Sequence, residues 1–365
     1  MLTDTMEDTV SERQQQQPTR RPLAIQFRYL ALVSALVLAL IANLAFGGVA
    51  IPFSDVISAL MSNFVDHDAP DRFTLVVNHI RLPRALAAML VGASLAITGA
   101  MLQGLFRNPL ADPGLVGVSA GAALAAVATI VFAHELSKWI VIDKMQYVLP
   151  VAAFLGGFLC TLLIYRISKR DGHTNVATML LAGIAINAIA LSMIGTLTYL
   201  SDDEQLRDVV FWQLGSLGGV SWSLLLPTIP LLVIPLLILK WASGPLNALA
   251  LGEDDAGNLG VNVTALTYLI ILAVAIGVGA AVAISGIIGF VGLIVPHLIR
   301  LISGVNHRHL LPQSALLGSC LLLLADLTSR TIVVPAELPI GLVTSAFGGP
   351  FFLWLLVRNR KRLAT

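Results

Sequence analysis

The side chains able to do chemistry are few in this 365-residue chain, and their spacing forms no reaction centre. Its apolar stretches contain no Ser/His arrangement, no paired aspartates and no metal-ligand spacing of histidines. Cys160 and Cys320 lie in such stretches, where a thiol usually behaves as a small buried hydrophobe. A phosphate-cradling Gly-x-x-x-x-Gly-Lys-Ser/Thr loop is absent from the sequence. We therefore expect no enzyme activity, no metal site, no permanently bound cofactor and no nucleotide site on this chain.

The elements that carry these residues are apolar enough to lie in lipid. Hydrophobic residues make up 57% of the chain and charged residues 12%, against about 25% charged in a soluble domain. A helix needs about 20 mostly apolar residues to cross a bilayer. We predict an all-α polytopic membrane protein with about ten transmembrane helices: Arg28–Gly47, Ile80–Gly104, Gly114–His134, Tyr147–Ile167, Asn175–Leu200, Trp222–Trp241, Thr264–Ser285, Phe290–Ser303, Leu311–Arg330 and Ile340–Val357.

The distribution of basic residues orients these spans. With the N-terminus in the cytoplasm, about 15 of the 22 Lys and Arg residues fall on the inner side, as the positive-inside rule requires. Both termini are then cytoplasmic. We expect a disordered cytoplasmic tail over residues 1–27, rather than a signal peptide, a transmembrane domain over 28–358 and a basic cytoplasmic tail over 359–365.

Two segments of the chain resemble each other. Val91 to Gly99 reads VGASLAITG and Val278 to Gly286 reads VGAAVAISG, and the same offset places Pro109 on Pro296 and Gly117 on Gly304. The two helices would cross in opposite directions, as in an inverted internal repeat. The alternative is two Ala/Gly-rich faces that resemble each other because both allow close helix packing.

Several motifs in order resemble one family of membrane proteins. They are Arg81-Leu-Pro-Arg84, Gln103 to Gly114 (QGLFRNPLADPG), Phe211 to Leu217 (FWQLGSL), Leu251-Gly-Glu253, Gly289 to His297 (GFVGLIVPH) and Ala336 to Gly341 (AELPIG). Together they resemble the FecCD-type permeases of ABC transporters, which import siderophores, haem and vitamin B12.

This resemblance implies a subunit of a larger assembly in the bacterial inner membrane. Two permease copies would form a homodimer, two separate ATP-binding subunits would dock on the cytoplasmic side, and a periplasmic substrate-binding protein would deliver the ligand. Membrane lipid surrounds the assembly, and we expect no nucleic-acid partner.

The longest cytoplasmic loop would couple the chain to the ATPase. Asn247 to Leu259 allows a short amphipathic helix, and Gly260 is placed to cap it. The resemblance assigns ATPase coupling to Leu251, Gly252, Glu253, Ala256, Leu259 and Gly260. The alternative is a solvated acidic connector.

Arginines at the outer span ends would meet the binding protein. The resemblance implies that Arg81, Arg84 and Arg330 face acidic residues of that protein, where charge complementarity orients docking. The alternatives are that they reach lipid headgroups, or that Arg330 pairs with Asp326 one helical turn away.

Two further segments are candidates for the translocation path or gate. Asn108, Pro109 and Asp112 lie in a Pro/Gly-rich break between spans, which is either an inner gate or an ordinary tight cytoplasmic turn. Asp112 could cap the following helix. Arg207, Phe211 and Trp212 could offer haem a cation for its propionates and an aromatic wall, or Arg207 could pair with Asp203 or Asp208.

The segment around these residues most resembles the haem-importing branch, so haem is the expected transported ligand. A ferric siderophore or cobalamin is the alternative within the family. An ion-coupled secondary transporter is a more distant alternative, since it would need ionisable residues at mid-membrane, and Asp326 is the deepest candidate.

Overall fold

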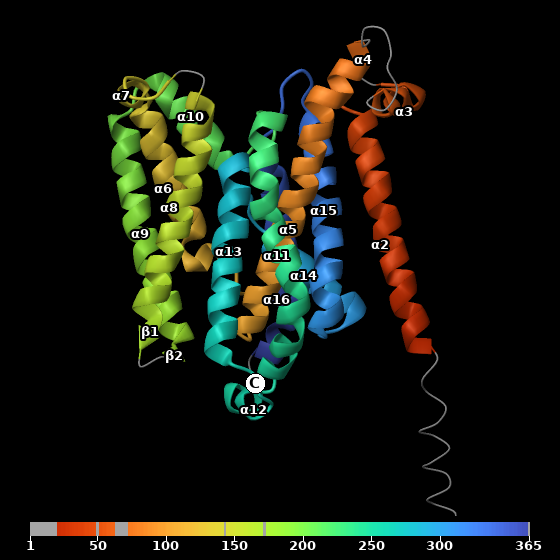
Figure 1. Cartoon of the computed structure of the whole chain (residues 1–365), viewed down its shortest axis with the longest axis vertical. Helices are drawn as coiled ribbons and strands as arrows, with labels where there is room; N and C mark the ends of the chain where they lie inside the picture. Colours follow the sequence, from red (N-terminus) through yellow and green to blue (C-terminus); the bar gives the residue numbers. More distant parts are fainter. Residues whose placement is uncertain (1–19, 49–50, 63–71, 142–143, 171–172, 364–365) are drawn as a thin grey trace, which may run out of the picture.

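The computed structural model describes residues 20–48, 51–62, 72–141, 144–170 and 173–363, and these residues are mostly helical (Figure 1). The elements in chain order are α2 (Arg20–Ala45), α3 (Phe53–Met61), α4 (Arg72–Leu75), the π-helix η1 (Val76–Arg81), α5 (Leu82–Leu105), the 3₁₀ helix η2 (Pro113–Val116), α6 (Val118–Val131), α7 (Ala133–Ser137), α8 (Met145–Ser168), β1 (Lys169–Arg170), β2 (His173–Thr174), α9 (Val176–Leu200), α10 (Asp203–Leu214), α11 (Trp222–Leu249), α12 (Glu253–Asn258), α13 (Val263–Ser285), α14 (Val291–Ser303), α15 (His307–Thr331) and α16 (Ile340–Leu363). The strands β1 and β2 form a small antiparallel hairpin between α8 and α9.

The ten predicted spans are confirmed in number and order among the described residues. Seven helices are long and apolar enough to cross a bilayer, and α6, α14 and the first part of α16 are shorter apolar helices. Two boundaries of the predicted tails fall inside helices, because α2 begins at Arg20 and α16 continues to Leu363. The remainder of those tails, residues 1–19 and 364–365, lies outside the described residues.

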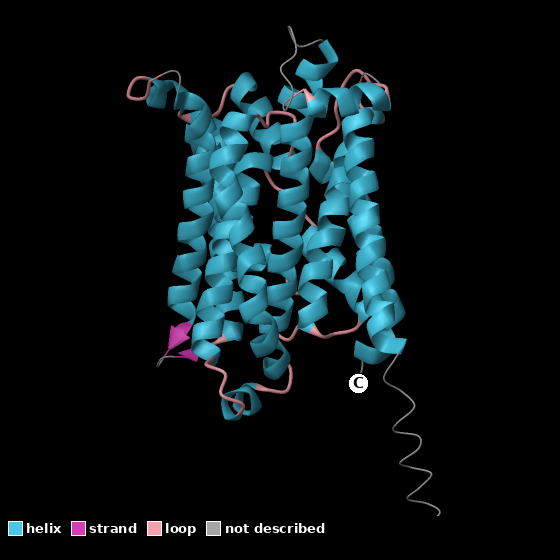
Figure 2. Cartoon of the chain, turned by 45° about the vertical axis from the view of Figure 1, so that its right-hand side comes forward, coloured by secondary structure: helices cyan, strands magenta, loops and turns pink. Residues whose placement is uncertain are grey.

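The long helices stand side by side in one bundle (Figure 2). At its centre α5 and α15 pack against each other as an antiparallel pair (Figure 1). Gly92 and Gly318 meet backbone to backbone at the middle of this seam, where a Cβ on either would collide with the other helix. Ser319 Oγ donates to the Met89 carbonyl at 2.7 Å. Small residues therefore let the two backbones approach closely, which favours helix association in lipid.

The two halves of the domain have the same order of elements. Helices of 24, 14, 24 and 25 residues (α5, α6, α8, α9) are followed by helices of 23, 13, 25 and 24 residues (α13, α14, α15, α16). The packing is exchanged between halves: α5 contacts α14 and α15, and α13 contacts α6 and α8. Because α5 and α13 run in opposite directions (Figure 1), the repeat is inverted.

The ungapped alignment of the two halves is wrong beyond the first helix pair. It placed Gly117 on Gly304, but Gly117 precedes α6 whereas Gly304 follows α14. The cause is the connector length, because residues 106–117 separate α5 from α6 and only 286–290 separate α13 from α14.

The bundle has two distinct ends (Figure 1). We call the lower one, which carries α12, the β1–β2 hairpin and the C-terminal part of α16, the α12 end. We call the upper one, which carries α3, α4, α7 and the start of α10, the α3 end. The chain enters α2 and leaves α16 at the α12 end, so both described termini lie on one side, as the sequence predicts.

Candidate functional site

The three predicted docking arginines come together at the α3 end in one ion cluster. Arg84 Nε contacts Asp326 Oδ1 at 2.8 Å, and Arg330 Nε contacts Asp326 Oδ2 at 3.2 Å. The other edge of Arg84 meets Glu337, with Nη1 donating to Oε1 at 3.0 Å and Nη2 lying 2.9 Å from Oε2. This arrangement joins α5, α15 and the loop before α16.

The same cluster holds the end of α2. Arg81 Nη1 donates to the Leu44 and Ala45 carbonyls at 2.7 and 2.9 Å, and Arg330 Nη2 donates to the Asn43 carbonyl at 3.0 Å. The last carbonyls of a helix lack intrahelical partners, and cations there are also favoured by the helix dipole. Asn43 Nδ2 completes the contact by donating to Asp326 Oδ2 at 3.0 Å.

These arginines are buried in the isolated chain, with 4–6% of each residue exposed. The alternative that Arg330 pairs with Asp326 one turn away is therefore confirmed. Their contact with a binding protein stays a prediction. Asn43 and Glu337 are partners that the sequence analysis did not single out, although a lone Asn within an otherwise apolar helix was the available signal for Asn43.

The predicted coupling segment lies at the tip of the α12 end. The helix is shorter than the Asn247–Leu259 range allowed from sequence, because α11 continues through Leu249 and Gly252, at φ +133°, separates it from α12. Gly260, at φ +82°, caps α12 as predicted, and Val261 N donates to the Ala256 carbonyl at 2.9 Å. That bond and the left-handed glycine form a Schellman motif.

The coupling residues divide into buried and exposed sets. Ala256 is a fully buried residue of α12, whereas Leu251 and Leu259, which flank this helix in the chain, are 67% and 64% exposed. Large apolar side chains exposed at a polar tip mark a surface that another protein covers. Glu253 begins α12, and its Oε1 lies 3.9 Å from Arg107 Nη2, with both side chains about half exposed.

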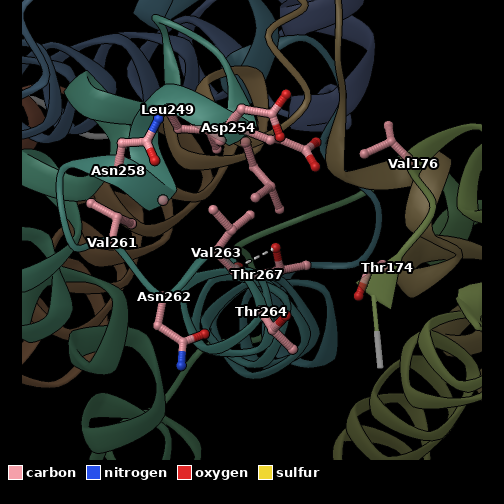
Figure 3. Close-up of a pocket in the computed structure, with 13 residues that line it drawn as sticks. Thr174, Val176, Leu249, Asp254, Asn258, Val261, Asn262, Val263, Thr264 and Thr267 are labelled. Carbon is pink, nitrogen blue, oxygen red and sulfur yellow. Dashed lines mark hydrogen bonds between the residues drawn. The ribbon is translucent and has the colours of Figure 1, made fainter. Parts of the chain in front are cut away.

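A cavity of about 470 Å³ separates α12 from the hairpin side of the molecule (Figure 3). Asp254 and Asn258 line it from α12, and Thr264 and Thr267 from the first turns of α13. Thr267 Oγ1 is satisfied by the Val263 carbonyl at 2.8 Å. The cavity therefore lies between α12 and the first turns of α13, beside the β1–β2 hairpin.

The irregular segment that contains Asn108, Pro109 and Asp112 climbs from the α12 end into the bundle. Asn108 and Pro109 are exposed beside the end of α5. Asn187, at the middle of α9, donates its Nδ2 to the Gly114 carbonyl at 3.2 Å. An ordinary tight turn therefore does not describe this segment, since it reaches mid-bundle depth against protein, as irregular backbone in a membrane must.

Asp112 caps the short helix that follows, as the sequence predicts. Its Oδ1 accepts from Gly114 N at 2.8 Å at the start of η2. Because α6 has only 14 residues, about 21 Å, it cannot span a bilayer alone and begins at mid-depth. Whether the Asn108–Gly114 break acts as a gate stays a prediction.

The third group lies on α10 at the α3 end. Asp202 and Gln205 form a capping box that starts this helix. Arg207 and Phe211 are exposed and one turn apart on the same face, whereas Trp212 packs partly buried against the core. Among the described residues Arg207 makes no ion pair with Asp203 or Asp208. The structure thus brings Arg207 and Phe211 together and turns Trp212 away from them.

This bundle, with an inverted repeat, half-length helices that begin at mid-depth and an exposed apolar tip, defines a membrane transport subunit that does not itself hold a nucleotide loop. The profile of the FecCD transport family matches residues 35–358. The chain therefore belongs to the FecCD family and is a permease subunit of an ABC importer, not an enzyme.

Individual relatives agree with this family. The chain is 50% identical over 284 residues to the hemin transport system permease protein HmuU of Yersinia pestis, covering 78% of this chain and 84% of that protein. It is 42% identical to the vitamin B12 import system permease protein BtuC of Escherichia coli, covering 80% and 86%. Among solved structures, a metal-chelate type ABC transporter in an inward-facing conformation superposes with a TM-score of 0.77 at 33% identity, covering 90% of this chain and 98% of that one.

Proposed function

We propose that this chain is the membrane permease of a bacterial importer for haem. The observation that carries the proposal is the 50% identity to a hemin permease, compared with 42% to a vitamin B12 permease. Ferric siderophores and cobalamin are the competing ligands, because both are large chelates that a chamber of the same family could pass.

The working unit is a homodimer with two ATP-binding subunits and a substrate-binding protein in the bacterial inner membrane. The α12 end faces the cytoplasm, with both termini, and the α3 end faces the periplasm. The bias of Lys and Arg toward the α12 end supports this orientation. The exposed Leu251 and Leu259 support ATPase docking at that end.

Transport needs no bond making on this chain. Haem released at the α3 end enters a chamber between the two copies, and closure of the ATPase alternates the access of that chamber. Arg207 and Phe211 share an exposed face of α10, where a guanidinium suits a propionate and an aromatic ring suits the flat macrocycle.

Reconstitution in proteoliposomes tests the proposal. The chain is combined with its ATPase and binding protein, and uptake of haem, cobalamin and a ferric siderophore is measured with and without ATP. ATP-dependent uptake that prefers haem supports the proposal. Preference for cobalamin or the siderophore overturns the ligand, and equal uptake without the ATPase overturns the importer assignment.

A further inference from the structure

The ion cluster at the α3 end contains one carboxylate that solvent can reach. Asp326 is completely buried and 7% of the Arg84 side chain is exposed, whereas 46% of the Glu337 side chain is exposed. Glu337 lies in the loop between α15 and α16, where residues 331–337 are all exposed. Within the cluster, Glu337 is therefore the member that a protein approaching from the α3 end would meet.

Glu337 occupies the part of Arg84 that could otherwise bind a partner. Asp326 holds Nε, so the two terminal nitrogens form the free fork, and Glu337 takes both of them at 3.0 and 2.9 Å. A carboxylate from another protein would make the same two-pronged contact. Since Arg84 offers a single such fork, the two carboxylates exclude each other.

Arg81 and Arg330 do not offer a partner a pair of terminal nitrogens as Arg84 does. Arg81 and Arg330 direct guanidinium nitrogens at the final carbonyls of α2. A Cβ on Gly47 would stand 3.1 Å from Arg330 Nη1 and 3.3 Å from Arg81 Nη2, so both guanidinium groups lie close against this glycine. Moving either arginine toward a partner would uncap α2, whereas moving Glu337 requires only the displacement of an exposed loop residue.

The charges of the cluster also favour such an exchange. Arg81, Arg84 and Arg330 with Asp326 and Glu337 sum to one net positive charge, and without Glu337 they sum to two. Departure of Glu337 therefore uncovers a stronger positive site at the moment an acidic group arrives, which is the condition for electrostatic steering.

We propose that Glu337 is an internal placeholder: it occupies the Arg84 fork in the undocked chain, and an acidic side chain of the binding protein displaces it on docking. This inference rests on the proposed function, because the partner is the binding protein of the importer. It adds a competitor within the chain to the docking contact and explains how a buried arginine becomes available.

Displacement of Glu337 would also affect how the α15–α16 loop packs against the bundle. Leu338 N donates to the Ser329 carbonyl at 2.9 Å, and Ile340 N, at the start of α16, donates to the Gly215 carbonyl at 3.0 Å, where α10 ends. A Cβ on Gly218 would stand 3.3 Å from Glu337 Oε2. Release of Glu337 therefore loosens the loop that sets the first turn of α16 against the end of α10.

The direct test measures the affinity of the reconstituted transporter for its haem-free binding protein. Glu337→Gln weakens the competition of residue 337 with the partner's carboxylate for the terminal nitrogens of Arg84. We therefore expect association about three- to fivefold tighter at low salt, in keeping with a half-exposed ion pair. Glu204→Gln is the matched control, since Glu204 is an exposed acid at the same end, outside the cluster, and it should leave the affinity unchanged. Weaker or unchanged association of Glu337→Gln, with the control unaffected, overturns the placeholder.

A second measurement does not depend on removing Glu337. A nitroxide on Ala336→Cys, next to Glu337 and exposed, is placed in a variant that lacks Cys160 and Cys320. We expect its electron paramagnetic resonance spectrum to narrow when the binding protein is added, and to be narrow already when Glu337→Gln is combined with it. An unchanged spectrum on docking overturns the exchange. The proposed function fails separately, if the unlabelled wild type shows no ATP-dependent haem uptake.

Discussion

At the scale of single residues, the most informative side chains are a few buried charges at the α3 end. Asp326 is fully buried, yet its two oxygens contact Arg84, Arg330 and Asn43. Removing charges from water is expensive, and a buried ion pair offsets that cost only when its hydrogen bonds are nearly complete. In the cluster, Asp326 gains hydrogen bonds from Arg84 and Asn43, and Arg81 and Arg330 also donate to the last carbonyls of α2. In contrast, Arg330 Nε and Asn43 Oδ1 have no hydrogen-bond partner among the described residues.

The first prediction concerns Asp326. Asp326→Asn keeps the shape but removes the charge that balances Arg84 and Arg330, so we expect a loss of about 3–5 kcal/mol of stability. Thermal unfolding in detergent measures it as a lower midpoint. The matched control is Glu135→Gln, which breaks the exposed pair with Lys138 and should cost less than about 1 kcal/mol. Equal midpoints for the two variants would contradict this account of Asp326.

Sequence predicted the residues of this cluster better than their contacts. Arg81, Arg84 and Arg330 were recognisable because positive charge at outer span ends is unusual, and the pairing of Arg330 with Asp326 followed from helical spacing. Neither pattern could bring Asn43 and Glu337 to them, because those contacts span 283 residues (Asn43 to Asp326) and 253 residues (Arg84 to Glu337) of chain. Such contacts depend on how α2 and the α15–α16 loop pack, which no local pattern records.

At the scale of the elements, glycines allow particular pairs of helices to approach closely. A Cβ on Gly99 of α5 would collide with the backbone of Gly292 in α14, and one on Gly277 of α13 with the side chain of Pro235 in α11. These approaches place α5 at the core, where most of its residues are buried. The contacts of a helix in lipid depend on such shape matching, because lipid tails are as apolar as the helices.

The second prediction compares two glycines within helices. Gly99→Ala forces a methyl group into the Gly292 backbone, so we expect a loss of about 1–3 kcal/mol through overpacking. Gly195→Ala in α9 is the control, because nothing lies within 4 Å of its Cβ position, and it should be neutral or slightly stabilising. Thermal unfolding of both variants in detergent measures the difference. A destabilised Gly195→Ala beside an unaffected Gly99→Ala would refute this packing.

The third prediction concerns the α12 tip. Leu251→Ser combined with Leu259→Ser removes the exposed apolar side chains that flank α12, so we expect ATP-driven uptake to fall by at least about tenfold through weaker ATPase association. Val305→Ser, which changes another exposed apolar residue at the α12 end, should retain uptake. Co-purification of the ATPase gives a second readout, and full retention of the ATPase by the double variant would remove these leucines from the coupling surface.

Spans were the most predictable elements, and breaks between them the least. Apolar stretches located ten apolar helices, of which seven are long enough to cross a bilayer. In contrast, α12 is shorter than its pattern allowed, because Gly252, at φ +133°, separates it from α11. The depth of the Asn108–Gly114 segment also escaped prediction. A Pro/Gly-rich stretch predicts that the helix ends but does not say how far into the bundle the chain then runs.

At the scale of the whole molecule, the inverted repeat explains why the chain has two unlike ends. Each half places its short helix, α6 or α14, with an N-terminus inside the bundle and runs it toward the opposite end. The two ends then differ through elements outside the repeat, namely α3 and α4 at one end and α12 at the other (Figure 1). The ion cluster on α5, α15 and the α15–α16 loop adds buried charges at the α3 end. Two such surfaces suit one partner on each side of the membrane.

The fourth prediction fixes which end faces the cytoplasm. In a variant without Cys160 and Cys320, a single cysteine is placed at Asn258 in α12 or at Asp203 at the start of α10. Both positions are exposed, so a membrane-impermeant maleimide reaches each from one side only. In intact cells with a permeable outer membrane we expect Asp203→Cys to react and Asn258→Cys to stay unlabelled, and in inside-out vesicles the reverse, because basic residues gather at the α12 end. Labelling of Asn258→Cys in intact cells would invert the orientation and with it the sides assigned to the ATPase and the binding protein.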